Sequence, residues 1–85
     1  MIFLELKDLE TVNSFCKICD RYHDKMDIDV KYGRYIIDGC SILAVTSLTG
    51  KTIKVIPHTG DALLKEYFFK SIEEIGAYKI DRTNV

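Results

Sequence analysis

Residues 26–38 restrict the fold more than any other part of the chain. Apolar and polar side chains alternate without a break over residues 26–32, which is the pattern of a strand with one buried face. Gly33-Arg34 follows as a Gly-X dipeptide that suits a two-residue hairpin turn, and residues 35–38 return as the partner strand. The sequence therefore predicts an antiparallel hairpin in the middle of the chain.

Two other stretches alternate in the same way. Residues 2–7 and 51–57 are therefore predicted strands, each with one apolar face. Pro57 is expected to end the second of them, because proline has no N–H to donate to a strand ladder.

Two further stretches carry apolar side chains at helical spacing. One helix is expected over residues 11–23, with Asp8 or Thr11 as its cap. The other is expected over residues 62–75, with Gly76 as its stop.

The order of the elements is strand, helix, hairpin, short helix, strand, helix. It predicts an α+β fold in which helices cover the single apolar face of a sheet, a two-layer open-faced sandwich. Residues 1–85 are taken as a single domain, with a tail from about residue 77.

The composition argues against several classes of protein. A chain of 85 residues with a formal charge of −1 and interspersed charges has no basic stripe for nucleic acid or a membrane surface. No apolar run is long enough to span a bilayer, and the amino terminus lacks the pattern of a signal peptide. With an odd count of 3 cysteines, these features predict a reducing, cytoplasmic location.

Cys16 and Cys19 form a CxxC pair on the apolar stripe of the first predicted helix. A structural zinc site needs four ligands, and the sequence has no second Cys or His pair of suitable spacing. A redox CxxC normally opens a helix, whereas this pair lies in the middle of one. We therefore expect buried, reduced thiols, no bound metal and no cofactor.

A short amphipathic stretch begins with Ser41 and continues through Ile42, Leu43, Val45 and Leu48. Its spacing predicts one or two helical turns with an apolar face. Ser41 stands at the N-cap, where its hydroxyl can accept a hydrogen bond from a backbone N–H. Taken alone, the stretch is a capped helical turn that covers the core.

The element order, together with Ser41-Ile42-Leu43-Ala44-Val45-Thr46-Ser47-Leu48, resembles HPr, the small phosphocarrier of the bacterial phosphoenolpyruvate-dependent sugar phosphotransferase system. The similarity runs from Met1 to about Gly76. It implies the order β-α-β-β-α-β-α, an antiparallel four-stranded sheet of strand order 1-4-2-3, helices on one face and an open second face. It also implies protein partners from the phosphotransferase system or its regulators.

By the same resemblance, Ser41 is a candidate for regulatory phosphorylation by an ATP-dependent HPr kinase. The exposed members of Ile42, Leu43 and Leu48 would then form the partner-binding surface. Cys40 stands where the family often has a basic residue. The resemblance thus implies a binding surface that phosphorylation of Ser41 would switch, but without the basic residue that the family often has beside the serine.

The catalytic motif of the family, Leu-His-Thr-Arg-Pro at the start of the first helix, is degenerate in this chain. The resemblance places Leu9-Glu10-Thr11-Val12-Asn13 there, so Glu10 stands at the phospho-accepting histidine and Val12 at the arginine. Glu10 has no imidazole nitrogen to act as a nucleophile, and Val12 supplies no cation for the phosphoryl group. Glu10, Thr11 and Val12 therefore mark a degenerate site without a catalytic residue.

The chain has 2 histidines, His23 and His58, and both are expected at element ends that point away from this motif. We therefore expect a regulatory or binding protein of the sugar phosphotransferase system that is not an enzyme. Two alternatives stay open. One is a phosphocarrier with an unrecognised acceptor, and the other is an unrelated protein-interaction module on the same fold.

The open face of the predicted sheet suggests how the chain associates. The strand order that the resemblance implies brings Phe3 and Ile56 close together on this face, with Ile36 apart on the edge strand. A small apolar patch of this kind predicts a monomer or a weak dimer. In the alternative, Tyr78 and Ile80 of the tail cover the patch.

Overall fold

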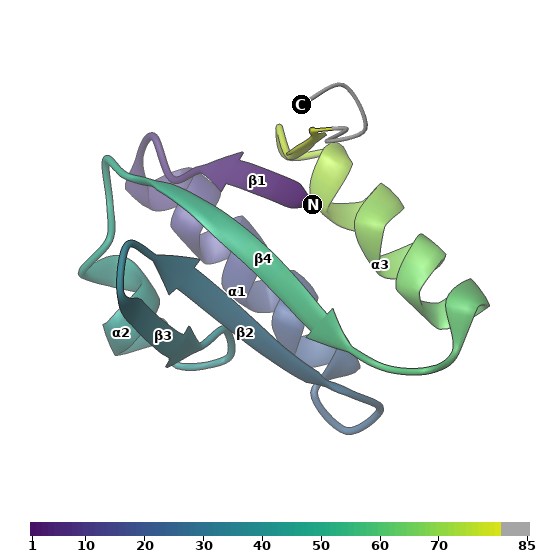
Figure 1. Ribbon diagram of the computed structural model, residues 1–85. Coiled ribbons are helices and arrows are strands. Elements are labelled where there is room, and N and C mark those ends of the chain that lie inside the picture. Colours follow the sequence, from purple (N-terminus) through teal and green to yellow (C-terminus); the bar gives the residue numbers. More distant parts are fainter. Residues whose placement is uncertain (81–85) are drawn as a thin grey trace.

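The computed structural model describes residues 1–80. Within them the elements are β1 (Ile2–Glu5), α1 (Leu9–Tyr22), β2 (Asp27–Tyr32), β3 (Tyr35–Asp38), α2 (Ile42–Thr46), β4 (Thr52–His58), α3 (Ala62–Glu73) and β5 (Tyr78–Lys79). The strands form one antiparallel sheet in the order β3-β2-β4-β1-β5 (Figure 1). The predicted α+β class with an open antiparallel sheet and helices is confirmed.

The predicted four-stranded sheet is wrong, because a fifth strand lies beside β1. In β5, Tyr78 pairs with Phe3, and the two rings stack with centroids 6.1 Å apart. The backbone N–H of Ile80 donates to the Met1 carbonyl at 3.0 Å. The segment from Ala77 to Ile80 thus lies along an otherwise unpaired sheet edge, and the rest of the predicted tail lies outside the described residues.

The hairpin has the predicted register. Tyr32 pairs with Tyr35 across a two-residue turn, and Gly33 takes a φ of +59°, which other residues rarely adopt. Strand β4 differs from its prediction, since it continues past Pro57 to His58. The proline is tolerated because β1 begins opposite Val55, so no β1 residue is left to accept a bond from position 57.

Both long helices begin at an aspartate cap. Asp8 caps α1, which starts two residues before the predicted position 11. Asp61 caps α3 by accepting hydrogen bonds from the N–H groups of Leu63 and Leu64, both at 3.1 Å. Gly76, with a φ of +110°, follows the end of α3.

The core lies between one face of the sheet and the helices. Figure 1 shows α1 behind β2 and β4. The largest fully buried side chains are Phe15, Phe68, Ile2, Leu4, Leu6, Ile28, Ile53, Ile72, Val12, Val30, Val45 and Cys19. These residues come from both layers, as an amphipathic sheet and amphipathic helices require.

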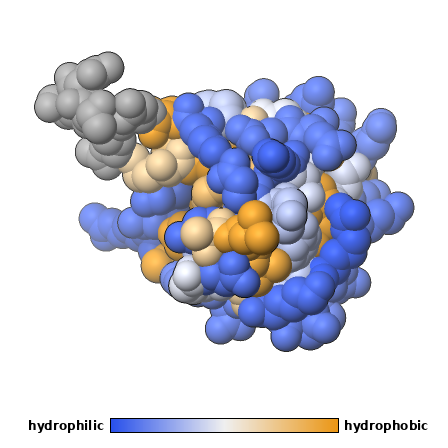
Figure 2. Space-filling view, turned by 90° about the vertical axis from the view of Figure 1, so that its right-hand side faces the viewer, coloured by the Kyte–Doolittle hydropathy of each residue, from blue (hydrophilic) through white to orange (hydrophobic). Residues whose placement is uncertain are grey.

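The surface beside α3 is mostly hydrophilic. Figure 2 views the molecule from the side on which α3 lies, and the largest apolar area on this side lies in the lower middle, among mostly hydrophilic residues. On α3 itself, Leu63 and Tyr67 are exposed. None of the helices within residues 1–80 has both the length and the hydropathy needed to cross a bilayer.

Candidate functional site

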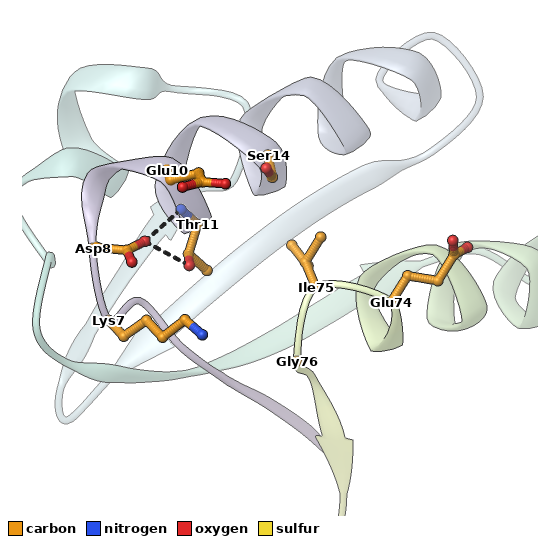
Figure 3. Close-up of a pocket in the computed structure, with 8 residues that line it drawn as sticks. All are labelled: Lys7, Asp8, Glu10, Thr11, Ser14, Glu74, Ile75 and Gly76. Carbon is orange, nitrogen blue, oxygen red and sulfur yellow. Dashed lines mark hydrogen bonds between the residues drawn. The ribbon is translucent and has the colours of Figure 1, made fainter.

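A hollow of about 450 Å³ opens where the first turns of α1 face the end of α3. Its walls come from the β1–α1 turn with the first turns of α1, and from the α3–β5 turn (Figure 3). The lining residues are Lys7, Asp8, Glu10, Thr11, Ser14, Glu74, Ile75 and Gly76. It contains two of the three residues that the sequence assigned to the degenerate catalytic site, Glu10 and Thr11.

Asp8 and Thr11 are bound to each other in this hollow. One carboxylate oxygen of Asp8 accepts the backbone N–H and the hydroxyl of Thr11, both at 2.8 Å (Figure 3). The hydrogen bond from the Thr11 backbone, followed by that from its side chain, lowers the pKa of Asp8 below its usual range. Asp8 is therefore a charged cap whose oxygen is already engaged, and Thr11 is buried beside it.

Glu10 and Val12 lie on opposite sides of α1. Glu10 is exposed in the first helical turn, as predicted, where the helix dipole favours a negative charge. Val12 is fully buried in the core. The position that the resemblance gives to an arginine therefore cannot present a cation to this hollow without rearrangement of the core.

Carboxylates dominate the charge around the hollow. The hollow is lined by three carboxylates, those of Asp8, Glu10 and Glu74, and by one amine, that of Lys7. A phosphoryl group in the hollow would be repelled by carboxylates, whereas an amine or guanidinium group would be attracted. The hollow therefore suits a cationic group better than a phosphate.

The hollow continues as a groove of about 560 Å³ between α1 and α3, which shares Ser14, Glu74 and Ile75 with it. Lys17 and Arg21 line this second part. The charge therefore changes from acidic at the start of α1 to mixed further along the helix.

Neither histidine of the chain reaches the hollow, as the sequence predicted. His23 is the C-cap of α1, at the other end of the helix, and its Nδ1 lies 2.7 Å from the Asp20 carbonyl oxygen. This hydrogen bond raises the pKa of His23. His58 ends β4, and its Nε2 lies 2.8 Å from a carboxylate oxygen of Asp29.

Ser41 is the N-cap residue of α2, as predicted, but its hydroxyl makes no capping hydrogen bond. The two residues after it are strongly exposed, with 51% of Ile42 and 84% of Leu43 accessible. Leu48 is partly buried and packs against the core instead. The predicted partner-binding surface is therefore reduced to Ile42 and Leu43, next to a half-exposed serine.

A second hollow, of about 400 Å³, separates α1 from α2 and has Cys16, Cys40 and Ile42 in its walls. The Sγ of Cys40 lies 3.6 Å from the Cys19 carbonyl oxygen. Burial, more than neighbouring carboxylates, raises the pKa of all three thiols, most strongly at Cys19. These free thiols are therefore poor nucleophiles, and Cys19 is buried as predicted while Cys16 is half-buried.

Residues 1–80 contain no group of three or more His, Cys, Asp or Glu side chains placed to hold a metal ion. Comparisons of the chain with family models, with curated proteins and with solved structures found no match.

Proposed function

We propose that this chain is an HPr-like binding protein that regulates sugar uptake in the cytoplasm and does not carry phosphate on histidine. The observation that carries this proposal is the acidic hollow at the start of α1. Glu10 lies there, at the position that the resemblance gives to the phospho-accepting histidine. The neighbour order β3-β2-β4-β1 also agrees with the sheet that the resemblance implies.

The chemistry of the hollow supports binding over phosphoryl transfer. Transfer through phosphohistidine needs an imidazole nitrogen, and neither His23 nor His58 lines the hollow. It also needs nearby cations or N–H donors for the phosphoryl oxygens, whereas most of the charged groups here are carboxylates. A protein partner that brings a basic side chain would be held electrostatically.

The exposed residues of α2 supply the apolar part of the proposed docking surface. Leu43 has 84% of its surface accessible, and Ile42 beside it also lines the hollow between α1 and α2. Apolar side chains that anchor in a partner commonly contribute most of the binding energy of an interface. We assign the acidic hollow to orientation and the pair Ile42 and Leu43 to affinity.

Phosphorylation and binding assays with purified phosphotransferase proteins test the proposal. We expect no label on this chain after incubation with radiolabelled phosphoenolpyruvate and enzyme I, under conditions that label ordinary HPr. We expect binding to at least one of enzyme I, a sugar-specific enzyme II component or HPr kinase by titration calorimetry. Leu43→Ser should weaken that binding about tenfold, the effect of losing roughly 1.4 kcal/mol.

A matched control is Leu63→Ser, which alters an exposed leucine of α3 away from both docking residues. It should bind like the wild type. An acid-labile phosphate on the chain would support a phosphocarrier with an unrecognised acceptor. If the chain binds none of the three partners, the result would contradict the proposal and favour the alternative of an interaction module unrelated to sugar transport.

A further inference from the structure

The helix-free face of the sheet, turned toward the viewer in Figure 1, is built from side chains that alternate with those of the core. Lys54 lies near the middle of this face, paired with Phe3 of β1 and with Lys31 of β2. The row continues to Tyr78 of β5 on one side and to Ile36 of β3 on the other. We call these five residues the lysine row, and it crosses every strand of the sheet.

A second row lies two residues further along each strand. Asp29 of β2 pairs with Asp38 of β3 and with Ile56 of β4. The register of β1 continues this row through Met1 to Ile80, whose N–H donates to the Met1 carbonyl at 3.0 Å. We call these five residues the aspartate row. The two rows run side by side across the open face.

Each row places like charges directly opposite one another. Lys31 faces Lys54 across the β2–β4 pair, and Asp29 faces Asp38 across the β2–β3 pair. Directly opposite like charges destabilise a sheet. Among residues 1–80, neither lysine has a carboxylate within ion-pair distance, and the ion pair on this face joins Asp29 to His58. The face therefore carries a lysine pair without a carboxylate partner and an aspartate pair in which Asp29 already contacts His58.

The β1 and β5 ends of both rows are apolar. Phe3 stacks on Tyr78, and 45% of Tyr78, 45% of Ile80 and 42% of Met1 remain accessible. Ile56, on the neighbouring strand, is partly exposed. Contiguous exposed apolar residues of this kind mark interaction sites. The open face thus combines an apolar half with a charged half.

We propose that this face binds a second copy of the chain as a two-fold symmetric dimer. The operation is a rotation by a half-turn about an axis that lies in the interface, perpendicular to the strands and midway between the rows. This rotation lays the lysine row of each copy over the aspartate row of the other. Lys31 then meets the other copy's Asp29, and Phe3 meets its Met1. Lys54 and Asp38 lie over isoleucines of the other copy, so the charge complementarity rests on Lys31 and Asp29.

Symmetry makes each of these contacts twice, so a single chain supplies both halves of every pair. Sheets that pack face to face keep their strands within about 30° of each other, which preserves the overlap of the two rows. The face used is opposite to the helices, so Ile42 and Leu43 stay accessible in both copies. The dimer is therefore independent of the proposed docking function, and either can fail without the other.

Sedimentation velocity of the full chain over a wide concentration range tests the dimer. We expect a monomer–dimer equilibrium that weakens as salt is added, because exposed charge pairs are screened. Lys31→Glu and Asp29→Lys should each raise the dissociation constant about tenfold or more, since each reverses two contacts. Phe3→Ser combined with Ile56→Ser should weaken the dimer through its apolar half.

The decisive sample is an equimolar mixture of the Lys31→Glu and Asp29→Lys chains. In a mixed dimer, each introduced charge meets an opposite charge of the other chain, so association should return. The matched controls are Glu66→Lys and Lys70→Glu on the exposed surface of α3, which should leave the equilibrium unchanged. Circular dichroism checks that every variant is folded.

Three results would overturn the proposal. The first is a wild-type chain that stays monomeric up to about millimolar concentration, which corresponds to less than roughly 4 kcal/mol of binding free energy. The second is a dimer that neither charge reversal affects. The third is a mixture of the two variants that associates no better than either one alone.

Discussion

Asp8 is the residue whose ionisation is most clearly coupled to the fold. Its two hydrogen bonds from Thr11 lower its pKa below the usual 3.8. A carboxyl group with a lower pKa in the folded state stabilises the fold above its unfolded-state pKa. This contribution is lost as the pH falls through the folded-state pKa. We therefore expect the free energy of unfolding to fall less steeply below pH 3.8 in Asp8→Asn than in the wild type.

Urea unfolding at a series of pH values measures this difference. Asp24→Asn is the control, because Asp24 is an exposed carboxylate that follows the end of α1 and lies outside the cap. It should keep the wild-type slope of stability against pH below 3.8. If Asp8→Asn showed that same slope, the cap would not be the source of the coupling.

The three thiols give a second prediction for single residues. Burial raises the pKa of Cys16, Cys19 and Cys40, and the thiolate is the reactive form. We expect the folded chain to react with a disulfide reagent at pH 8 more slowly than the urea-unfolded chain, because a raised pKa leaves less thiolate. Cys19 should react last, because it is fully buried.

Mass spectrometry of partly labelled protein assigns the order of reaction. Cys16→Ser and Cys40→Ser each remove one of the two half-buried thiols and should leave the rate at Cys19 slow. Fast labelling of Cys19 in the folded chain would show that α1 opens locally far more often than its packing implies.

Among the helices, α2 is the short element on which the proposed regulation depends. It has 5 residues, and the hydroxyl of its N-cap residue Ser41 makes no capping hydrogen bond. An unengaged, half-exposed hydroxyl is available to a kinase. We expect HPr kinase and ATP to phosphorylate the chain at Ser41, which adds roughly two negative charges beside Ile42 and Leu43. Partners that dock apolar groups there should then bind more weakly.

Phosphopeptide mass spectrometry locates the modification. Ser41→Ala should remove it, whereas Ser47→Ala should not, because the Ser47 hydroxyl at the other end of α2 donates to the Ala44 carbonyl at 2.5 Å. If the chain stays unmodified under conditions that label ordinary HPr, the role of Ser41 is limited to that of a helix boundary.

The sequence predicts elements well where a local pattern determines them. The hairpin follows from unbroken alternation and from Gly33, which accepts the positive φ of the turn. Strand β5 could not be predicted in this way, because two residues are too few to show a period. It forms through a long-range contact, the pairing of Tyr78 with Phe3 at the exposed edge of β1.

The candidate site could be predicted only in part, because its hollow forms when distant parts of the chain pack together. Glu10 was correctly expected at the surface near the start of α1, since that depends only on the helix. The hollow also needs Glu74 and Gly76, which arrive from the end of α3 and share no local signal with Glu10. The burial of Val12 agrees with the apolar stripe that the sequence predicts for the first helix, which includes Val12 and faces the sheet.

The last prediction concerns the single core that joins α1, α3 and the sheet. Phe68 of α3 is fully buried, and its ring meets that of Tyr22 at the end of α1 edge-on, with centroids 5.4 Å apart. Replacing a buried phenylalanine by alanine costs about 3–5 kcal/mol, through lost burial and the cavity left behind. A domain of this size has a total stability of roughly 5–10 kcal/mol. We therefore expect Phe68→Ala to remove about half of it.

The neighbouring variant Tyr67→Ala is the matched control, because Tyr67 lies on the same helix with 54% of its surface accessible. It should change the free energy of unfolding by less than about 0.5 kcal/mol, as for an ordinary surface substitution. Urea unfolding followed by far-ultraviolet circular dichroism and by tyrosine fluorescence should give one shared transition in all three proteins, with an unchanged m-value. Because the helices and the sheet share one core, a separate early transition of α3 in Phe68→Ala would contradict this expectation. It would mean that α3 is held to the sheet as an independent unit.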